Sequence, residues 1–136
     1  MDLPDRYNAA QDLLTRNLAP ERRDRTAFVD ARGAWSFAAL AERAARFAGL
    51  LAASGIQEEQ RVVLCLHDGI DFPAAFLGAM QHGAVPIPIN TRLTAAEKRY
   101  ILRDSRARAL VVSAELWEEL SAVLPQAPDL RHVWIE

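Results

Sequence analysis

The sequence predicts an α/β fold in which helices flank a mostly parallel sheet. Short apolar runs of strand length alternate with segments of helical periodicity along most of the 136 residues. The run 61–66 is apolar after its first residue, which is typical of a strand covered on both faces. Each gap between consecutive runs is long enough for the helix of a right-handed βαβ unit. The expected strands of this sheet cover residues 61–66, 85–89, 109–112 and 132–135.

A first helix is expected near the start of the chain. Asn8 is of a residue type that accepts a hydrogen bond at a helix N-cap, and the helix should end before Pro20. The mixed-charge run 21–25 that follows is typical of a solvated loop. The apolar face of the helix should contain Ala9, Leu13 and Leu14.

A short β-hairpin and a long helix should come next. Residues 26–30 form its first strand, 31–33 the turn and 35–37 the return. Ser36 stands at the N-cap of the helix, and Gly55 ends it where a left-handed backbone costs least. Helical spacing places Phe37, Leu40, Ala44, Phe47, Ala48 and Leu51 on one face.

The third helix should follow the buried strand 61–66. Asp68 or Asp71 can cap it, Pro73 fits its first turn, and Gly83 ends it. Its apolar face should hold Phe72, Phe76, Ala79 and Met80.

The next segments carry clear boundary signals. Two prolines within 85–89 remove donors of sheet hydrogen bonds, so this run should be an edge or irregular strand. Thr94 and Glu97 form a capping box that opens a fourth helix. Ser113 should cap a fifth helix that runs to about Val123.

Composition and charge exclude several classes of function. Hydrophobic residues make up 51% and charged residues 25%, as in globular proteins, and the net charge is −2. A nucleic-acid-binding protein usually has a basic excess, which is absent here. No apolar stretch approaches the roughly 20 residues of a membrane helix, and residues 1–5 lack the features of a signal peptide. With Cys65 as the one cysteine, no internal disulfide can form, and we expect a cytoplasmic protein.

The sequence shows no reaction centre of its own. Its six glycines are not spaced as in a dinucleotide fingerprint or a phosphate-binding loop, and no Gly-x-Ser-x-Gly elbow occurs. Cys65, His67, His82 and His132 are scattered along the chain and match no usual metal-ligand spacing. We interpret Cys65 as a buried thiol, His67 as a loop residue and His82 as a complement to a helix C-terminus.

Two stretches resemble core motifs of the adenylate-forming enzymes, the group that includes acyl-CoA synthetases, peptide-synthetase adenylation domains and luciferases. Residues 35–40 resemble the first core motif. Residues 77–90 resemble the second, which combines a leucine, a small-residue segment and an apolar strand with prolines. The resemblance covers nearly the whole chain.

Within this group the sequence is most similar to the N-terminal segment of benzoate-CoA ligases. It departs at Ala39, where the family commonly has a glutamate that would complete a capping box with Ser36. The missing glutamate weakens the helix start by about 1 kcal/mol or less and does not bear on the chemistry. The narrower resemblance rests on residues 7–10, 64–66, 71–79, 90–94 and 104–108.

The resemblance implies a two-step reaction in a full-length enzyme. Benzoate attacks the α-phosphate of ATP to give an acyl-adenylate and pyrophosphate, and the thiol of CoA then displaces AMP. ATP, Mg²⁺ and CoA are thus the implied cofactors, held by residues beyond the equivalent of residue 136. We therefore expect residues 1–136 to be the N-terminal portion of the AMP-binding domain, truncated before the ATP-binding loop. We expect this portion to be inactive by itself and to bind none of the cofactors.

Arg92 is the one site residue that the resemblance implies in this chain. In related aryl-CoA ligases, an arginine in the Asn-x-Arg-Leu context contacts a phosphate of CoA, and residues 90–93 match that context. A guanidinium suits this contact because it presents paired donors to phosphate oxygens. The alternative is a surface arginine near the start of the helix capped by Thr94.

Two other hypotheses about the function stay open. The chain could be a free-standing α/β binding or interaction module without catalysis. The ligase could also act on a substituted or alicyclic acid instead of benzoate. The expected partners are the aryl carboxylate, ATP and CoA, with no nucleic acid and no membrane. The chain should in addition self-associate, through strand edges such as residues 133–135.

Overall fold

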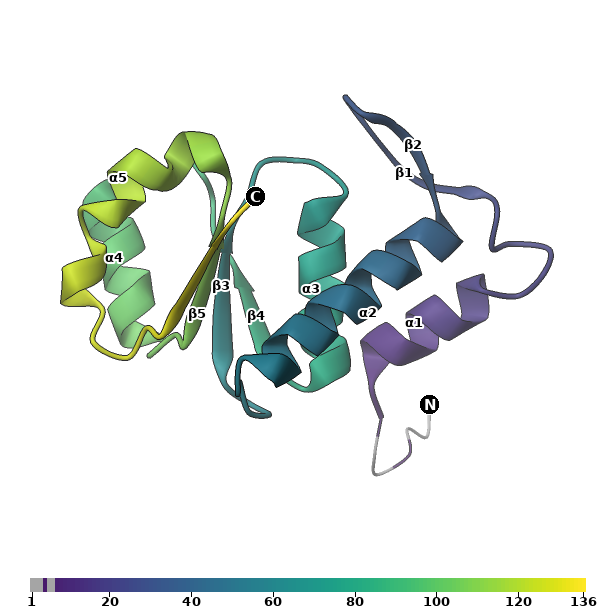
Figure 1. Ribbon diagram of the computed structural model, residues 1–136, viewed down its shortest axis with the longest axis horizontal. Coiled ribbons are helices and arrows are strands. Elements are labelled where there is room, and N and C mark those ends of the chain that lie inside the picture. Colours follow the sequence, from purple (N-terminus) through teal and green to yellow (C-terminus); the bar gives the residue numbers. More distant parts are fainter. Residues whose placement is uncertain (1–3, 5–6) are drawn as a thin grey trace.

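A parallel sheet of four strands forms the centre of the computed structural model, which describes residue 4 and residues 7–136 (Figure 1). The strand order is β4-β3-β5-β6, and all three neighbouring pairs are parallel. This arrangement confirms the predicted fold class. The strands are β3 (Arg61–Cys65), β4 (Val85–Pro88), β5 (Ala109–Val112) and β6 (His132–Ile135). The expectation drawn from residues 1–5 falls almost wholly outside the described residues.

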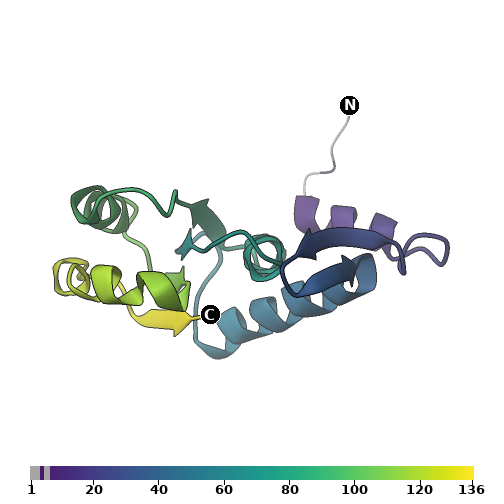
Figure 2. The same cartoon turned by 90° about the horizontal axis from the view of Figure 1, so that it is seen from above.

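Helices cover both faces of the sheet. On one face lie α2 (Phe37–Ala53) and α3 (Asp71–His82), and on the other lie α4 (Ala95–Asp104) and α5 (Trp117–Ser121) (Figure 1). The hairpin of β1 (Thr26–Asp30) and β2 (Gly33–Ser36) and the helix α1 (Ala9–Asn17) group at the α2 end (Figure 2).

The N-terminal helix begins as predicted. The Oδ1 atom of Asn8 accepts a hydrogen bond from the backbone N–H of Gln11 at 3.0 Å, and its Nδ2 donates to the carbonyl of Met80 at 2.7 Å. The predicted apolar face is wrong in two positions, because Ala9 is exposed as well as Leu13. Leu13 is 47% exposed, and the buried residues of the helix are Ala10 and Leu14.

The two central helices pack against each other at close range. Ser36 caps α2 by accepting from the N–H of Ala39, and Gly55 follows the helix with a left-handed φ of 72°. On α3, a Cβ built onto Gly78 would lie 2.4 Å from the carbonyl oxygen of Ala44. Only glycine allows the two backbones to approach so closely.

The predicted cap of α3 is wrong. Neither Asp68 nor Asp71 accepts a capping hydrogen bond, and Ile70 occupies the N-cap position. The N–H of Ile70 instead donates to Asp30 Oδ2 at 3.0 Å, across 40 residues of sequence. The end of the helix is as predicted, because Gly83 adopts φ 92° at its C-cap.

Strand β4 lies at an edge of the sheet, as its prolines predicted. The N–H groups of Val85 and Ile89 donate to β3-side carbonyls at 2.9 Å, so Pro86 and Pro88 alternate with them and face outward. The capping box of Thr94 and Glu97 that opens α4 is confirmed.

The fifth helix is shorter than predicted. The segment after β5 is a 3₁₀ turn (Ala114–Leu116), the helix α5 and a second 3₁₀ turn (Leu124–Gln126). Ser113 makes no capping hydrogen bond, because its Oγ accepts from the N–H of His67 at 3.0 Å instead. This partner, in the loop after β3, replaces the expected capping hydrogen bond.

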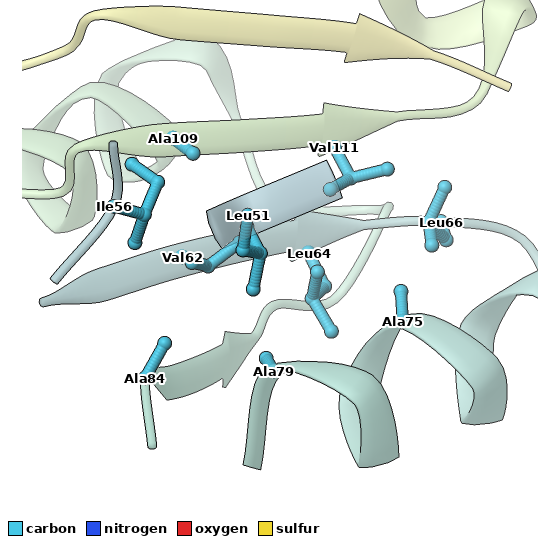
Figure 3. Close-up of a cluster of buried hydrophobic side chains, with 10 residues drawn as sticks. All are labelled: Leu51, Ile56, Val62, Leu64, Leu66, Ala75, Ala79, Ala84, Ala109 and Val111. Atoms are coloured by element: carbon cyan, nitrogen blue, oxygen red, sulfur yellow. The ribbon is translucent and has the colours of Figure 1, made fainter. Parts of the chain in front are cut away.

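Two apolar cores lie on the two faces of the sheet. Alternate residues of β3 point to opposite sides, with Val62 and Leu64 toward α2 and α3, and Val63 and Cys65 toward α4 and α5. The core under α2 and α3 is shown in Figure 3 and consists of Leu51, Ile56, Val62, Leu64, Leu66, Ala75, Ala79, Ala84, Ala109 and Val111.

Candidate functional site

The carboxyl ends of the four parallel strands meet at one edge of the sheet. After β3 the chain leaves toward α3 on one face, and after β5 it leaves toward α5 on the other. Neighbouring strands whose connections diverge in this way leave a crevice where open α/β sheets bind ligands. In this crevice Ser113 accepts from the N–H of His67 and donates to Glu136 Oε2 at 3.3 Å.

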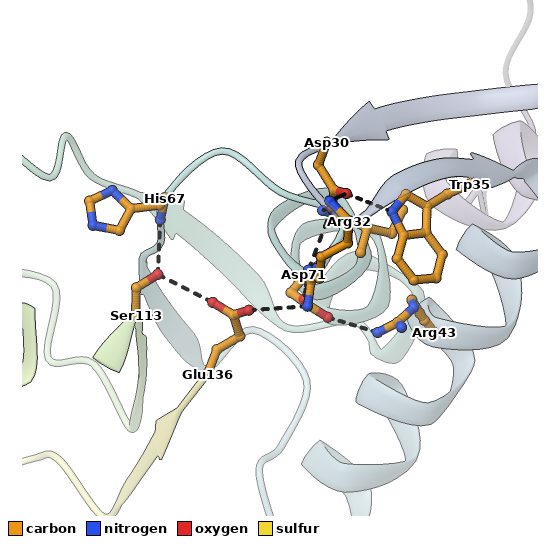
Figure 4. A network of polar contacts seen from close by, with 9 residues as sticks. Asp30, Arg32, Trp35, Arg43, His67, Asp71, Ser113 and Glu136 are labelled. Atoms are coloured by element: carbon orange, nitrogen blue, oxygen red, sulfur yellow. Dashed lines mark hydrogen bonds and ion pairs between the residues drawn. The ribbon is translucent and has the colours of Figure 1, made fainter. Parts of the chain in front are cut away.

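A polar network joins this edge to the β1–β2 hairpin (Figure 4). The guanidinium of Arg32, in the hairpin turn, donates to Asp71 at the start of α3. Arg43 of α2 donates to the other oxygen of Asp71 at 2.9 Å and lies 4.4 Å from the ring centre of Trp35. The Arg32 guanidinium also lies 3.6 Å from Glu136 Oε1. The network therefore fixes the hairpin relative to α2, α3 and the end of β6.

Asp30 is the most strongly hydrogen-bonded carboxylate of the network. It accepts from Trp35 Nε1 at 3.0 Å and from the backbone N–H groups of Ile70 and Arg32. These donors, with the Trp35 indole first, lower the pKa of Asp30 to about 2. Asp30 thus stays ionised and caps α3 from a distant strand.

Glu136 has the opposite electrostatic setting. Burial raises the pKa of its carboxyl group, and the neighbouring Asp71 carboxyl raises it further. The Arg32 guanidinium and the Ser113 hydroxyl oppose this rise in the pKa.

The charges of the network satisfy one another and leave no group poised to react. Asp71 is shared by two arginines, and Asp30 is saturated by three donors. Among the described residues, no group of three or more His, Cys, Asp or Glu side chains could hold a metal ion. The role of this network is therefore structural. Sequence reasoning missed it because its members lie on separate elements, and no local motif marks them.

Arg92 lies on a turn that follows β4. The side chain of Asn90 accepts from the backbone N–H of Arg92 at 2.9 Å, and the carbonyl of Asn90 accepts from Leu93 at 3.2 Å. The guanidinium is exposed and makes no ion pair or hydrogen bond to another described residue. Since β4 is the edge strand next to β3, this turn belongs to the same carboxyl edge. Arg92 takes no part in the polar network.

The other residues considered from the sequence have structural contacts. A ring nitrogen of His82, in the last turn of α3, lies 2.7 Å from the carbonyl oxygen of Ile56. Cys65 is fully buried, and burial raises the pKa of its thiol, which makes it a poor nucleophile. His67 contributes its backbone N–H to the crevice.

An apolar groove lies beside the network, between α2, the start of α3 and strand β6. Its floor includes Leu66, Val111 and Trp134 of the sheet, and its walls include Phe47 and Leu50 of α2. Trp134 packs edge-on against Phe47 with ring centres 6.0 Å apart.

Comparison with known families shows to which family the chain belongs. Residues 15–135 match the model of the family described as AMP-binding enzyme. The chain belongs to this family. The resemblance inferred from residues 35–40 and 77–90 is thereby confirmed.

Relatives of this AMP-binding chain include aromatic acid ligases. It is 45% identical over 96% of its length to a benzoate–CoA ligase of Thauera aromatica, and 40% identical over 93% to a 4-hydroxybenzoate–CoA/benzoate–CoA ligase of Rhodopseudomonas palustris. The matched parts make up 25% and 24% of those proteins. The chain therefore spans about a quarter of the length of these relatives.

Solved structures show the same fold. A benzoate CoA ligase from Burkholderia xenovorans LB400 superposes with a TM-score of 0.89 at 35% identity, over 96% of this chain and 26% of that one. The anthranilate CoA ligase AuaEII, in complex with anthranoyl-AMP, superposes with a TM-score of 0.93 at 32% identity, over 99% of this chain and 26% of that one. Among the described residues, no helix is both long and apolar enough to cross a membrane.

Proposed function

We propose that this chain is the N-terminal portion of the AMP-binding domain of a benzoate–CoA ligase. The proposed enzyme converts benzoate, ATP and CoA into benzoyl-CoA, AMP and pyrophosphate through a benzoyl-adenylate. The observation that carries the proposal is the 45% identity to the Thauera ligase over 96% of the chain. The 40% identity to a ligase named for both benzoate and 4-hydroxybenzoate supports the same class of substrate and makes 4-hydroxybenzoate the second candidate. The single buried cysteine suits a cytoplasmic enzyme.

The described residues do not themselves fit ATP or Mg²⁺. A triphosphate needs a loop of backbone donors with a lysine, and Mg²⁺ needs oxygen ligands grouped around it. The carboxylates near the crevice are occupied by arginines and backbone donors, and no metal-binding group is found in the described part of the chain. We therefore assign no step of adenylate formation to these residues. The 136-residue chain alone is expected to form no benzoyl-CoA.

For CoA, one residue of this chain fits. Arg92 presents an exposed guanidinium from a short turn, and the turn is held by Asn90 on one side and by the capping box of Thr94 and Glu97 on the other. A guanidinium without a protein partner is free to bind a phosphate through paired donors. We assign Arg92 to a phosphate of the CoA nucleotide.

Replacing Arg92 tests this assignment in the full-length ligase. A charge-assisted hydrogen bond contributes about 1.5–3 kcal/mol, so Arg92→Ala should raise the KM for CoA by roughly tenfold to a hundredfold. Benzoate-dependent exchange of pyrophosphate into ATP should stay near normal, because CoA takes no part in that half-reaction. Arg92→Lys should recover only part of the loss, since a point charge replaces the planar fork.

The control is Arg23→Ala, which removes an exposed arginine from the loop before β1. It should leave the KM for CoA unchanged. An unchanged KM for CoA in Arg92→Ala as well would show that Arg92 is an ordinary surface residue, while the benzoate reaction itself would remain as evidence for the ligase.

A further inference from the structure

Lys98 is a charged residue in the interior of the molecule. It lies on α4, and its side chain is fully buried, although lysine is rarely buried without a partner. Its Nζ donates a hydrogen bond to Glu119 Oε1 of α5 at 3.0 Å. Both helices lie on the same face of the sheet and cover the apolar core that contains Leu102 and Leu120 (Figure 1). The described chain therefore buries this ammonium group by itself.

A buried ion pair of this kind contributes more to geometry than to stability. Removing an ammonium and a carboxylate from water costs free energy that their attraction roughly repays, and well-packed apolar side chains of similar volume are often as stabilising. The two charged groups must meet at hydrogen-bond distance, whereas apolar side chains tolerate a range of positions. The pair of Lys98 and Glu119 therefore fixes where α4 lies relative to α5.

Lys98 is also bonded to the turn that carries Arg92. Its backbone N–H donates to the carbonyl of Thr94 at 3.0 Å, and the N–H of Thr94 donates to Glu97 Oε2 at 2.8 Å. Thr94 follows Arg92 by two residues, and Leu93 between them packs into the core under α4 and α5. The ion pair, the first turn of α4 and the Arg92 turn are thus connected. A shift of α4 against α5 would move Arg92 with it.

We propose that Lys98 and Glu119 are positioning residues for CoA, because their ion pair holds α4 where the Arg92 guanidinium meets a phosphate of CoA. The inference rests on the proposed function, since it concerns the residue assigned there to CoA. Neither side chain needs to touch CoA itself, because both act through Arg92. Paired hydrogen bonds between a planar guanidinium and a phosphate depend on orientation as well as distance, so a small displacement of the turn weakens them.

Replacing both members of the pair in the full-length ligase tests the proposal. Lys98→Met/Glu119→Leu substitutes apolar side chains for the pair and leaves the net charge unchanged, so it does not alter the overall attraction for the CoA anion. The KM for CoA should rise roughly three- to tenfold, which is part of the loss expected of Arg92→Ala. Benzoate-dependent exchange of pyrophosphate into ATP should stay near the wild-type rate, because that half-reaction does not use CoA.

A double-mutant cycle separates positioning from a general effect on the structure. When Arg92→Ala is already present, replacing the pair should have no further effect on the KM for CoA, because the contact that the pair positions is gone. The control is Arg108→Met/Asp129→Leu, which removes an ion pair of 3.6 Å near the starts of β5 and β6 and also leaves the net charge unchanged. The control should leave the KM for CoA unchanged.

Amide hydrogen exchange gives a readout that does not depend on the reaction. The backbone N–H groups of Arg92 and Leu93 are bonded to Asn90, at 2.9 and 3.2 Å. Exchange in a peptide that covers residues 90–97 of the full-length protein, measured without substrates, should be faster in Lys98→Met/Glu119→Leu than in the wild type. The control variant should exchange as the wild type does.

A folded, active variant that lacks the pair and keeps the wild-type KM for CoA overturns the proposal. So does an equal rise in the KM with and without Arg92, or exchange at residues 90–97 that matches the wild type. An Arg92→Ala variant with a normal KM for CoA overturns the proposal together with the assignment of Arg92. A full-length wild type that forms no AMP with benzoate refutes the proposed function as well, which none of the preceding results does.

Discussion

The close contact between α2 and α3 makes Gly78 the most sensitive position of the described fold. Gly78→Ala would place a Cβ 2.4 Å from the carbonyl oxygen of Ala44 and 3.0 Å from Phe47 Cβ. Ala44 is completely buried, and the blocking atom belongs to the backbone, so no side-chain rotation can relieve the contact. The two helices must move apart.

The size of the effect follows from two opposing contributions. Overpacking a core costs about 1–3 kcal/mol, and a clash with backbone belongs at the upper end. Alanine in place of glycine stabilises a helix interior by about 1 kcal/mol. The clash outweighs the gain, and Gly78→Ala should lower the free energy of unfolding by about 2 kcal/mol. At roughly 4 °C for each kcal/mol, the Tm should fall by about 8 °C.

Thermal and urea unfolding followed by circular dichroism measure this change, at one fixed protein concentration because the chain is expected to self-associate. The control is Gly49→Ala on α2, where a Cβ would meet nothing within 4 Å. It should stabilise the protein by about 0.5–1 kcal/mol. If Gly78→Ala is as stable as the wild type, the helices are not in the close contact described here.

Two further predictions concern charged groups. The pKa of Asp30 is lowered from 3.8 to about 2, so its contribution to stability is complete above pH 4 and is lost as the pH falls toward 2. Asp30→Asn should therefore lose less stability than the wild type over that interval, measured by urea unfolding at each pH. Lys98 is fully buried and lies 3.0 Å from Glu119. Glu119→Ala leaves the Lys98 charge without its carboxylate and should lower the free energy of unfolding by about 2–4 kcal/mol. Lys98→Met should change the free energy of unfolding by no more than about 1 kcal/mol. Equal losses in the last two variants would contradict this account of the pair.

Elements with local signals could be predicted from the sequence. The caps at Asn8, Ser36 and Thr94 each bind a backbone N–H within three residues, and each was identified from residue type and position. The prolines of β4 predicted an edge strand, and this signal also lies within the segment itself. Strand β3 was found because it is covered on both faces and is therefore apolar throughout.

The errors arose where a distant residue replaced a local partner. The N-cap of α3 is served by Asp30, from a strand 40 residues earlier in the chain, which no pattern around Asp68 or Asp71 could indicate. Ser113 has the residue type of a cap, but its hydroxyl group instead accepts from the N–H of His67, in the loop that follows β3. The polar network escaped prediction for the same reason, because its contacts are created by the fold.

For Arg92, in the candidate site, the sequence likewise could predict one part and not another. Its context in residues 90–93 could be recognised from the sequence, and the structure places it on a held turn at the carboxyl edge of the sheet. Its assignment to a phosphate of CoA stays a prediction, which the Arg92→Ala variant tests.

Benzoate-dependent formation of AMP tests the central claim most directly. The full-length protein that carries this chain should form AMP, pyrophosphate and benzoyl-CoA in equal amounts from ATP, benzoate and CoA, whereas the isolated 136-residue chain should form none. Formation of ADP and phosphate in place of AMP, or AMP formation by the isolated chain, would contradict the assignment of this chain as the N-terminal, non-catalytic portion of a benzoate–CoA ligase.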